Sequence, residues 1–281
     1  MPNFPIVDSH VHFWDRAQVP ISWTEGLAIH RPFYPADLDA DRGAVELDAI
    51  VFVETNVDGG QHVQEADFVG KLAAADPRIK AIVAHAPLNG ATLEADLKAL
   101  SDRPLVRGIR HLIQGEDEEA LTTDPHFREG LRQLPRFGFH FEICILHHQF
   151  GAALRLMEAA PDVTYVMDHI AKPGIKAGIR EPWWQQIKQL SAFTNVTCKL
   201  SGVATEADHA NWQEDELRTY IDRVIEVFGP DRIMFGSDWP VMRLATSYPR
   251  WVEIVELALS SFSEADQRKV FAENAKKVYR L

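Results

Sequence analysis

The chain has 281 residues, of which 46% are hydrophobic and 25% are charged, as in globular rather than disordered or fibrous proteins. Its formal net charge of −12 argues against a nucleic-acid partner. No stretch approaches the roughly 18 apolar residues of a membrane helix, and the first five residues do not resemble a signal peptide. We therefore expect a cytoplasmic protein, with Cys144 and Cys198 reduced and buried in their apolar runs.

Eight short apolar runs of the kind found in buried parallel strands recur along the chain. They lie at residues 6–13, 48–54, 80–86, 106–112, 139–146, 163–169, 196–201 and 232–237. Amphipathic stretches separate them; one starts at Asp124-Pro125, where proline suits the first helical position. Residues 263–281 are typical of a final helix with Ser263 as its N-cap.

Eight strand–helix repeats in this length predict one α/β domain over residues 1–281, a (β/α)₈ TIM barrel with a C-terminal helix. A doubly wound sheet is the alternative, but no glycine-rich fingerprint follows the first strand. The long connection over residues 15–46 is expected to carry function, because long loops at the carboxyl end of a barrel usually do.

Polar residues gather where these strands end, which is where barrel chemistry collects. His10 and His12 share one face of the first strand, so they can bind a metal ion or polarise a carbonyl, although packing alone could also explain them. Later strand ends supply Arg110, Glu142, Asp168, His169, Lys172, Lys199 and Asp238. An Arg110–Glu142 ion pair, and a Lys199 that neutralises a carboxylate, are structural alternatives to substrate roles.

Six motifs occur in order along the whole chain: DSHVHFWD, LVRGIRH, MDHIAKP, CKLSG, RIMFGSDWP and FAENAKKVYRL. Through them the chain resembles the amidohydrolase superfamily. Its landmarks are HxH at the end of strand 1, His after strand 6 and Asp after strand 8. Within the superfamily, the chain is most similar to the sugar-lactonase branch, which includes L-fuconolactone and L-rhamnonolactone hydrolases and pyrone-dicarboxylate lactonases.

The resemblance implies that Asp238 activates water and that His10, His12 and His169 polarise a lactone carbonyl, directly or through a metal. These four residues would also be the metal ligands, with one Zn²⁺ as the favoured ion; catalysis without a metal stays open, as in the pyrone-dicarboxylate members. A two-metal site is not expected, because Arg110 stands where a bridging lysine would end strand 4 and strand 5 carries Glu142 rather than an evident histidine ligand.

A sugar lactone offers many hydroxyls and no fixed charge, which suits stacking and charge-assisted hydrogen bonds. The candidate substrate-binding residues are Trp23, Arg110, Glu142, Lys172 and Trp239. A pyrone dicarboxylate would need several arginines, so the expected partner is a small neutral lactone such as L-fucono-lactone. Monomer and homo-oligomer both stay open.

Two other functions compete with the lactonase hypothesis. A metal-dependent decarboxylase of an aromatic or unsaturated carboxylic acid would share the HxH, His and Asp landmarks on the same barrel. A catalytically inactive, ligand-binding barrel is disfavoured, because all four landmark residues are intact.

Overall fold

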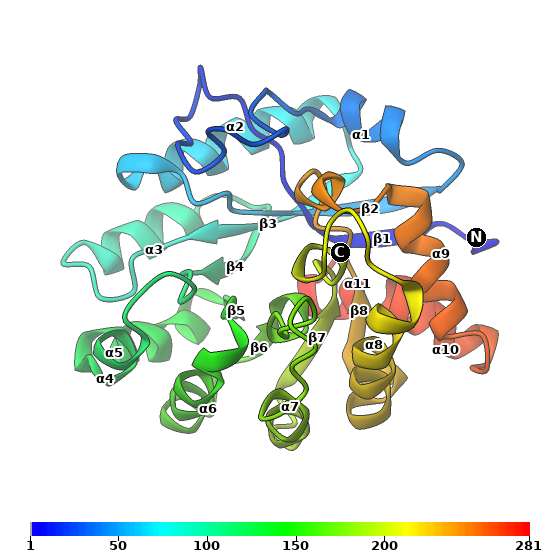
Figure 1. Ribbon diagram of the computed structural model, residues 1–281. Helices are drawn as coiled ribbons and strands as arrows, with labels where there is room; N and C mark the ends of the chain where they lie inside the picture. Colours follow the sequence, from blue (N-terminus) through cyan, green and yellow to red (C-terminus); the bar gives the residue numbers. More distant parts are fainter. Residues whose placement is uncertain (1) are drawn as a thin grey trace.

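The computed structural model describes residues 2–281, and its eight strands form one parallel sheet in chain order (Figure 1). The strands are β1 (Ile6–Val11), β2 (Leu47–Val53), β3 (Ile79–His85), β4 (Val106–Arg110), β5 (His140–Ile143), β6 (Tyr165–Met167), β7 (Val196–Leu200) and β8 (Ile233–Phe235). The segment after β8 pairs with β1, since the backbone N–H of Asp238 donates to His10 and that of His12 donates to Trp239. The expected TIM barrel is confirmed, and the doubly wound alternative is wrong.

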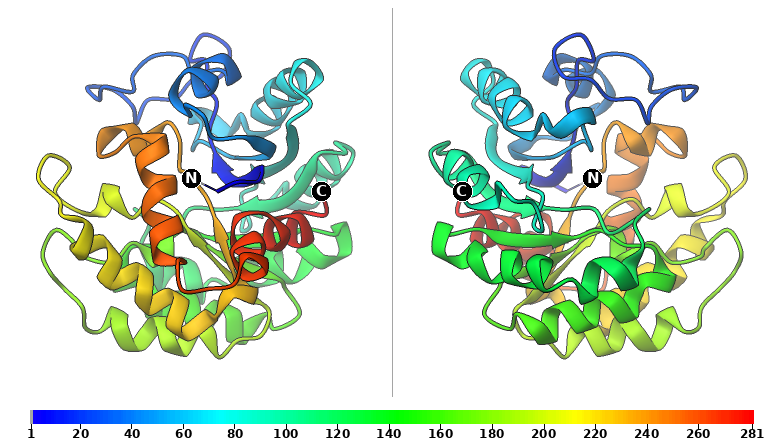
Figure 2. Two further views of the ribbon diagram at one scale, coloured as in Figure 1. Left: turned by 90° about the vertical axis from the view of Figure 1, so that its right-hand side faces the viewer. Right: turned by 90° about the vertical axis from the view of Figure 1, so that its left-hand side faces the viewer.

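Helices surround the sheet on its outer side (Figure 2). They are α1 (Pro35–Asp41), α2 (His62–Ala75), α3 (Leu93–Ser101), α4 (Glu118–Thr123), α5 (Pro125–Gln133), α6 (Phe150–Ala159), α7 (Trp183–Ser191), α8 (Glu214–Phe228), α9 (Tyr248–Ala258), α10 (Glu264–Arg268) and α11 (Asn274–Tyr279). The helix α5 starts as the sequence predicts, because the Asp124 side chain accepts a hydrogen bond from His126 N–H and Pro125 follows it.

Two apolar cores hold the fold together. The larger one fills the space between the sheet and the helices, and it includes the buried stripe of α8. The smaller one fills the barrel itself with short side chains such as Val7, Ala49, Val51 and Val83. Branched aliphatic side chains such as valine are typical of the layers that fill a barrel of this kind.

The predicted C-terminal helix is confirmed, but it is not a regular α-helix throughout. Ser263 caps α10 as expected, its Oγ accepting from the backbone N–H of Asp266. The helix then widens into a π-helical turn over Lys269–Glu273 before α11. Tyr279 of α11 is fully buried in the barrel core, so this segment contributes to the inside of the barrel as well as to its outer layer.

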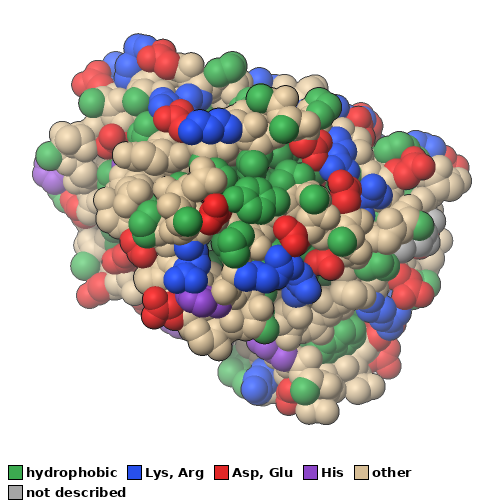
Figure 3. All heavy atoms as spheres, turned by 90° about the horizontal axis from the view of Figure 1, so that it is seen from above, with side chains coloured by type: hydrophobic (Ala, Val, Ile, Leu, Met, Phe, Trp, Pro, Cys, Tyr) green, Lys and Arg blue, Asp and Glu red, His purple; other side chains and the backbone are tan. Residues whose placement is uncertain are grey.

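Cys144 and Cys198 are free and buried, as expected. Across residues 2–281, the helices lack the length and apolar character needed to cross a lipid bilayer. The face shown in Figure 3 carries acidic and basic side chains interspersed around a central group of hydrophobic ones. Positive and negative side chains are therefore mixed on this face, and neither charge dominates it.

Candidate active site

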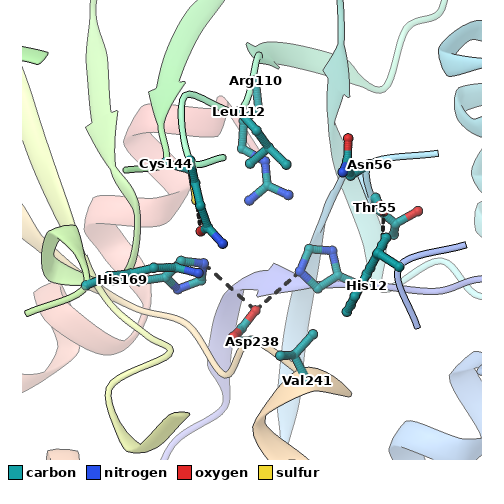
Figure 4. A pocket seen from close by; sticks show the side chains of 12 residues that line it. His12, Thr55, Asn56, Arg110, Leu112, Cys144, His169, Asp238 and Val241 are labelled. Carbon is teal, nitrogen blue, oxygen red and sulfur yellow. Dashed lines mark hydrogen bonds and ion pairs between the residues drawn. The ribbon is translucent and has the colours of Figure 1, made fainter. Parts of the chain in front are cut away.

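The three histidines that the sequence singled out surround one carboxylate oxygen of Asp238, and Figure 4 shows two of them, His12 and His169, turned toward it. Asp238 Oδ1, just after β8, lies 3.3 Å from His12 Nε2 and 3.6 Å from His10 Nε2. It lies 3.9 Å from Nε2 of His169, which follows β6. All four side chains are buried or nearly so. The carboxyl ends of three strands thus place three imidazoles around one carboxylate.

The backbone that presents two of these residues is left-handed. Asp238 has a φ of 63°, and His169 begins a run of four positive φ values that ends at Lys172. Such conformations are costly for residues other than glycine, and they cluster at functional sites. Gly202 makes room for the His169 ring, because a Cβ there would lie 2.5 Å from His169 Nδ1.

Hydrogen bonds decide which nitrogen of His12 carries its proton. Its Nδ1 lies 2.7 Å from the carbonyl oxygen of Val53, which can only accept, so Nδ1 is the donor. In the neutral ring, Nε2 therefore turns a lone pair toward the Asp238 carboxylate, which also carries lone pairs. Two acceptor atoms 3.3 Å apart repel each other unless a cation or a proton lies between them.

The donor set fits a single divalent ion. In a tetrahedral zinc site with Zn–N bonds of about 2.0–2.1 Å, neighbouring ligand atoms lie about 3.3–3.4 Å apart. The contacts of Asp238 Oδ1 with the three imidazoles span 3.3–3.9 Å. His10, His12 and Asp238 together form a group whose ligand atoms are close enough to share one ion. His169 Nδ1 bonds Ser201 Oγ at 2.9 Å, which orients its Nε2 toward the same point.

Burial sets the charge of these groups. It lowers the pKa of His169 from 6.5 to about 4 and holds the pKa of His10 well below its usual value, with the nearby Lys199 acting in the same direction. Burial would raise the pKa of Asp238, but the adjacent His169, His12 and His10 rings outweigh it and lower that pKa below its usual range. At neutral pH the site therefore holds neutral His10 and His169 beside an ionised carboxylate.

A network of buried charges lies beneath the imidazoles. Arg110 Nε donates to Glu54 Oε1 at 2.6 Å, and its Nη1 donates to Asp168 Oδ2 at 3.0 Å. Lys199 Nζ lies 2.6 Å from Glu142 Oε2 and 3.1 Å from Asp168 Oδ1. Lys199 thus neutralises carboxylates, as one interpretation of the sequence held, whereas Arg110 pairs with Glu54 and Asp168 in place of the suggested Glu142.

Above the network lies a cavity of about 250 Å³. Its lining residues are His12, Trp23, Thr55, Asn56, Arg110, Leu112, Gln114, Cys144, His169, Lys172, Asp238 and Val241. Of the five substrate-binding candidates, Trp23, Arg110 and Lys172 therefore border the cavity. Trp23 is held there by a 2.7 Å bond from its indole nitrogen to the carbonyl oxygen of Thr55.

The other two substrate-binding candidates lie elsewhere. Glu142 is fully buried below the cavity, where Lys199 and the hydroxyl of Tyr279 occupy its carboxylate. Trp239 points into the apolar core, and its indole nitrogen donates to Asp41. Neither side chain lines the cavity, so the prediction that these two residues bind substrate is not supported by their positions.

Sequence reasoning missed several residues of the cavity wall. Thr55 and Asn56 come directly after β2, and Leu112 and Gln114 follow β4. Their position at strand ends is a usable signal, but none of the four side chains is ionisable, so none stands out in the sequence. Glu54, which closes the run 48–54, was a detectable signal, because an acid at the end of a buried apolar strand requires a buried cation.

Comparison with known families matches residues 7–281 to the amidohydrolase family Amidohydro_2. The chain belongs to this family. Its sequence is 30% identical to an L-fucono-1,5-lactonase of Burkholderia ambifaria over 283 residues, which cover 98% of this chain and 95% of that protein. It is 26% identical to an L-rhamnono-gamma-lactonase of Scheffersomyces stipitis, and the alignment covers 100% of both chains.

A solved structure is also similar over its whole length. An amidohydrolase of Burkholderia multivorans, crystallised with bound zinc, superposes with a TM-score of 0.87 at 29% identity. The superposition covers 99% of this chain and 100% of that one. The resemblance that the sequence motifs indicated is therefore confirmed at the level of family and fold.

Proposed function

We propose that this amidohydrolase is a lactonase that opens a neutral sugar lactone, such as L-fucono-1,5-lactone, to the free acid. The observation that carries the proposal is the ionised Asp238 surrounded by three imidazoles at a cavity bordered by Trp23 and Arg110. The lactonase names of relatives that align over nearly the whole chain support the same reaction.

Ester hydrolysis needs an activated water, a base and a group that stabilises the developing oxyanion. Asp238 is the base: it takes a proton as the water oxygen forms its bond to the lactone carbonyl carbon. When the ring C–O bond breaks, Asp238 returns that proton to the departing ring oxygen, and the product is a hydroxy acid. Arg110, which faces the cavity from the opposite wall, is positioned to donate to the substrate (Figure 4).

His10, His12, His169 and Asp238 would hold one divalent ion, with Zn²⁺ favoured by the three imidazole donors. Such an ion supplies Lewis-acid polarisation of the carbonyl and lowers the pKa of water. The ionic state of Asp238 agrees with this role, because ligating carboxylates must be deprotonated.

If a metal is required, removing it should abolish turnover reversibly. Dialysis against a chelator is expected to stop lactone hydrolysis, and adding one equivalent of Zn²⁺ per chain should restore it. Metal content is measured in parallel by atomic emission. Full activity in protein shown to be metal-free would contradict a metal role and leave the imidazoles as direct hydrogen-bond donors.

The charges around the cavity favour a neutral substrate. The Arg110 guanidinium is already paired with Glu54 and Asp168. Lys172 Nζ lies 3.8 Å from Glu206, so a carboxylate is close to the second cation as well. A substrate with two carboxylates would need unpaired cations on more than one side. Hydroxyl groups, by contrast, can bond to Asn56, Gln114 and Lys172 without such compensation.

The proposal is tested by presenting the purified protein with substrates of each competing class. Acid release is followed with a pH indicator on a panel of aldono-lactones and on a pyrone dicarboxylate, and CO₂ release is followed on hydroxybenzoates. We expect acid release from aldono-lactones above all. CO₂ release without hydrolysis of any lactone would overturn the proposal and identify the barrel as a decarboxylase.

A further inference from the structure

Each ring nitrogen of the fully buried His10 faces one hydrogen-bond donor and one acceptor. Its Nδ1 lies 3.2 Å from Lys199 Nζ and 3.4 Å from Asp168 Oδ1. Its Nε2 lies 3.4 Å from Arg110 Nη1 and 3.6 Å from Asp238 Oδ1. A neutral imidazole has a single N–H, so two tautomers compete, and only one leaves the Nε2 lone pair available to a cation.

Arg110 distinguishes the two tautomers. A proton on Nε2 would confront the guanidinium N–H at 3.4 Å, which places two donors together. A proton on Nδ1 instead faces Asp168 Oδ1 at 3.4 Å, a buried oxygen that accepts no other hydrogen bond within residues 2–281, and Nε2 then accepts from Arg110 or binds a cation. Because an arginine side chain only donates, this tautomer avoids placing two donors together at Nε2.

Lys199 is the competing donor on the other side of the His10 ring, but its ammonium also forms ion pairs with two carboxylates. Glu142 Oε2 is its shortest contact at 2.6 Å, and Asp168 Oδ1 lies at 3.1 Å. The ammonium also lies 5.6 Å from the centre of the Tyr279 ring. Tyr279 Oη donates to the second oxygen of Glu142 at 2.6 Å, which fixes that carboxylate in place.

We infer that Asp168 is a positioning residue that holds the proton of His10 on Nδ1 and so presents Nε2 to the cavity. Lys199 supports this arrangement by balancing the charge of Asp168, and Glu142 supports it by taking the shortest contact of the Lys199 ammonium. The inference rests on the proposed function only in taking His10 as a site residue. A carboxylate behind a ligating histidine commonly fixes its tautomer and raises its basicity.

The tautomer can be observed directly in the metal-free protein. In a sample labelled with ¹⁵N-histidine, long-range ¹H–¹⁵N correlations assign the protonated nitrogen of each ring. We expect the His10 proton on Nδ1. His12, whose Nδ1 must donate to the Val53 carbonyl, is the internal reference. A His10 proton on Nε2 would overturn the inference.

The variant Asp168→Asn tests the consequence for metal binding. Competition with a chromophoric chelator measures Zn²⁺ affinity, which is expected to fall by about 10–100-fold, as for other losses of such a carboxylate. Glu65→Gln is the control: Glu65 is also a buried acid, but it bonds Thr55 rather than a histidine of the site, so the Zn²⁺ affinity of this variant should be unchanged.

Unchanged Zn²⁺ affinity in a folded Asp168→Asn protein would overturn the inference. If that variant does not fold, the tautomer of the wild-type ring still decides the question. Neither readout uses a lactone. Failure of the proposed function would therefore appear as absent hydrolysis with a normal tautomer and normal Zn²⁺ affinity.

Discussion

Arg110 shows how single residues make this site possible. It is a buried cation that donates to both the carboxylate and the backbone carbonyl of Glu54 and to the carboxylate of Asp168. Isolated charges are costly to bury, and each carboxylate is tolerated because this guanidinium compensates it. The same side chain borders the cavity, so one residue serves both stability and substrate contact.

Removing that cation should therefore destabilise the fold. For Arg110→Met we expect the free energy of unfolding to fall by about 3–5 kcal/mol, because Glu54 and Asp168 lose their compensating charge in the interior. Urea denaturation followed by circular dichroism measures the change.

The matched control is Arg155→Met, which removes an exposed arginine paired with Glu119. Exposed ion pairs are worth about 0–1 kcal/mol, so this variant should unfold almost as the wild type does. Equal losses in the two variants would show that the buried network does not depend on Arg110.

At the scale of elements, the turns that follow the strands decide the geometry of the site. The left-handed run that starts at His169 packs against the turn after β7, where Gly202 also has a positive φ of 59°. The contact leaves no space for a side chain, because a Cβ on Gly202 would overlap the His169 ring.

Gly202→Ala should therefore lower kcat by displacing His169. Gly178→Ala is a suitable control, since Gly178 has a φ of 64° and open space around its Cα. Both variants incur the backbone cost of alanine in a left-handed conformation, about 1 kcal/mol. Lactone hydrolysis should fall only in the Gly202 variant; equal activity of the two variants would contradict the packing argument.

The turn after β2 depends on a buried acid of α2. Glu65 Oε1 accepts from both the backbone N–H and the hydroxyl of Thr55, whose carbonyl in turn holds Trp23. Burial, together with the nearby Glu54, raises the pKa of Glu65 from 4.5 to about 8. This acid therefore keeps its proton at neutral pH in the folded protein.

Stability should respond to pH accordingly. Between about pH 4.5 and 8 the folded state retains a proton on Glu65 that the unfolded state has released, so this group's contribution to stability falls as pH rises. Glu65→Gln keeps the acceptor oxygen but has no proton to lose. Its stability relative to wild type should increase with pH across this range in urea titrations, and parallel curves would contradict the assignment.

At the scale of the whole molecule, the sequence predicted the barrel because its strands are continuous apolar runs that need burial on both faces. That Asp238 and three histidines lie together was also predictable, since their motifs lie at strand ends. The π-helical turn in the C-terminal helix was not, because residues 269–273 contain no glycine, proline or other local mark of an irregular turn.

The orientation of single side chains was the harder problem. Glu142 belongs to a strand, and whether it faces substrate or a buried partner depends on its depth in the barrel and on Tyr279, which lies 137 residues later. Trp239 follows the last strand, where the alternation of a strand no longer predicts which way a side chain points. Its indole nitrogen donates to Asp41, so the ring lies away from the cavity. Such contacts between distant segments leave no local signal.

The most direct test of lactone hydrolysis by this cavity compares wild type with Asp238→Asn on L-fucono-1,5-lactone. The initial rate of acid release is measured at neutral pH in the presence of Zn²⁺, with circular dichroism to establish that both proteins are folded. We expect turnover by the wild type and a loss of about 10²–10⁴-fold in the variant, as for removal of a general base. Near-normal turnover by folded Asp238→Asn, or none by the zinc-loaded wild type, would contradict the proposed chemistry.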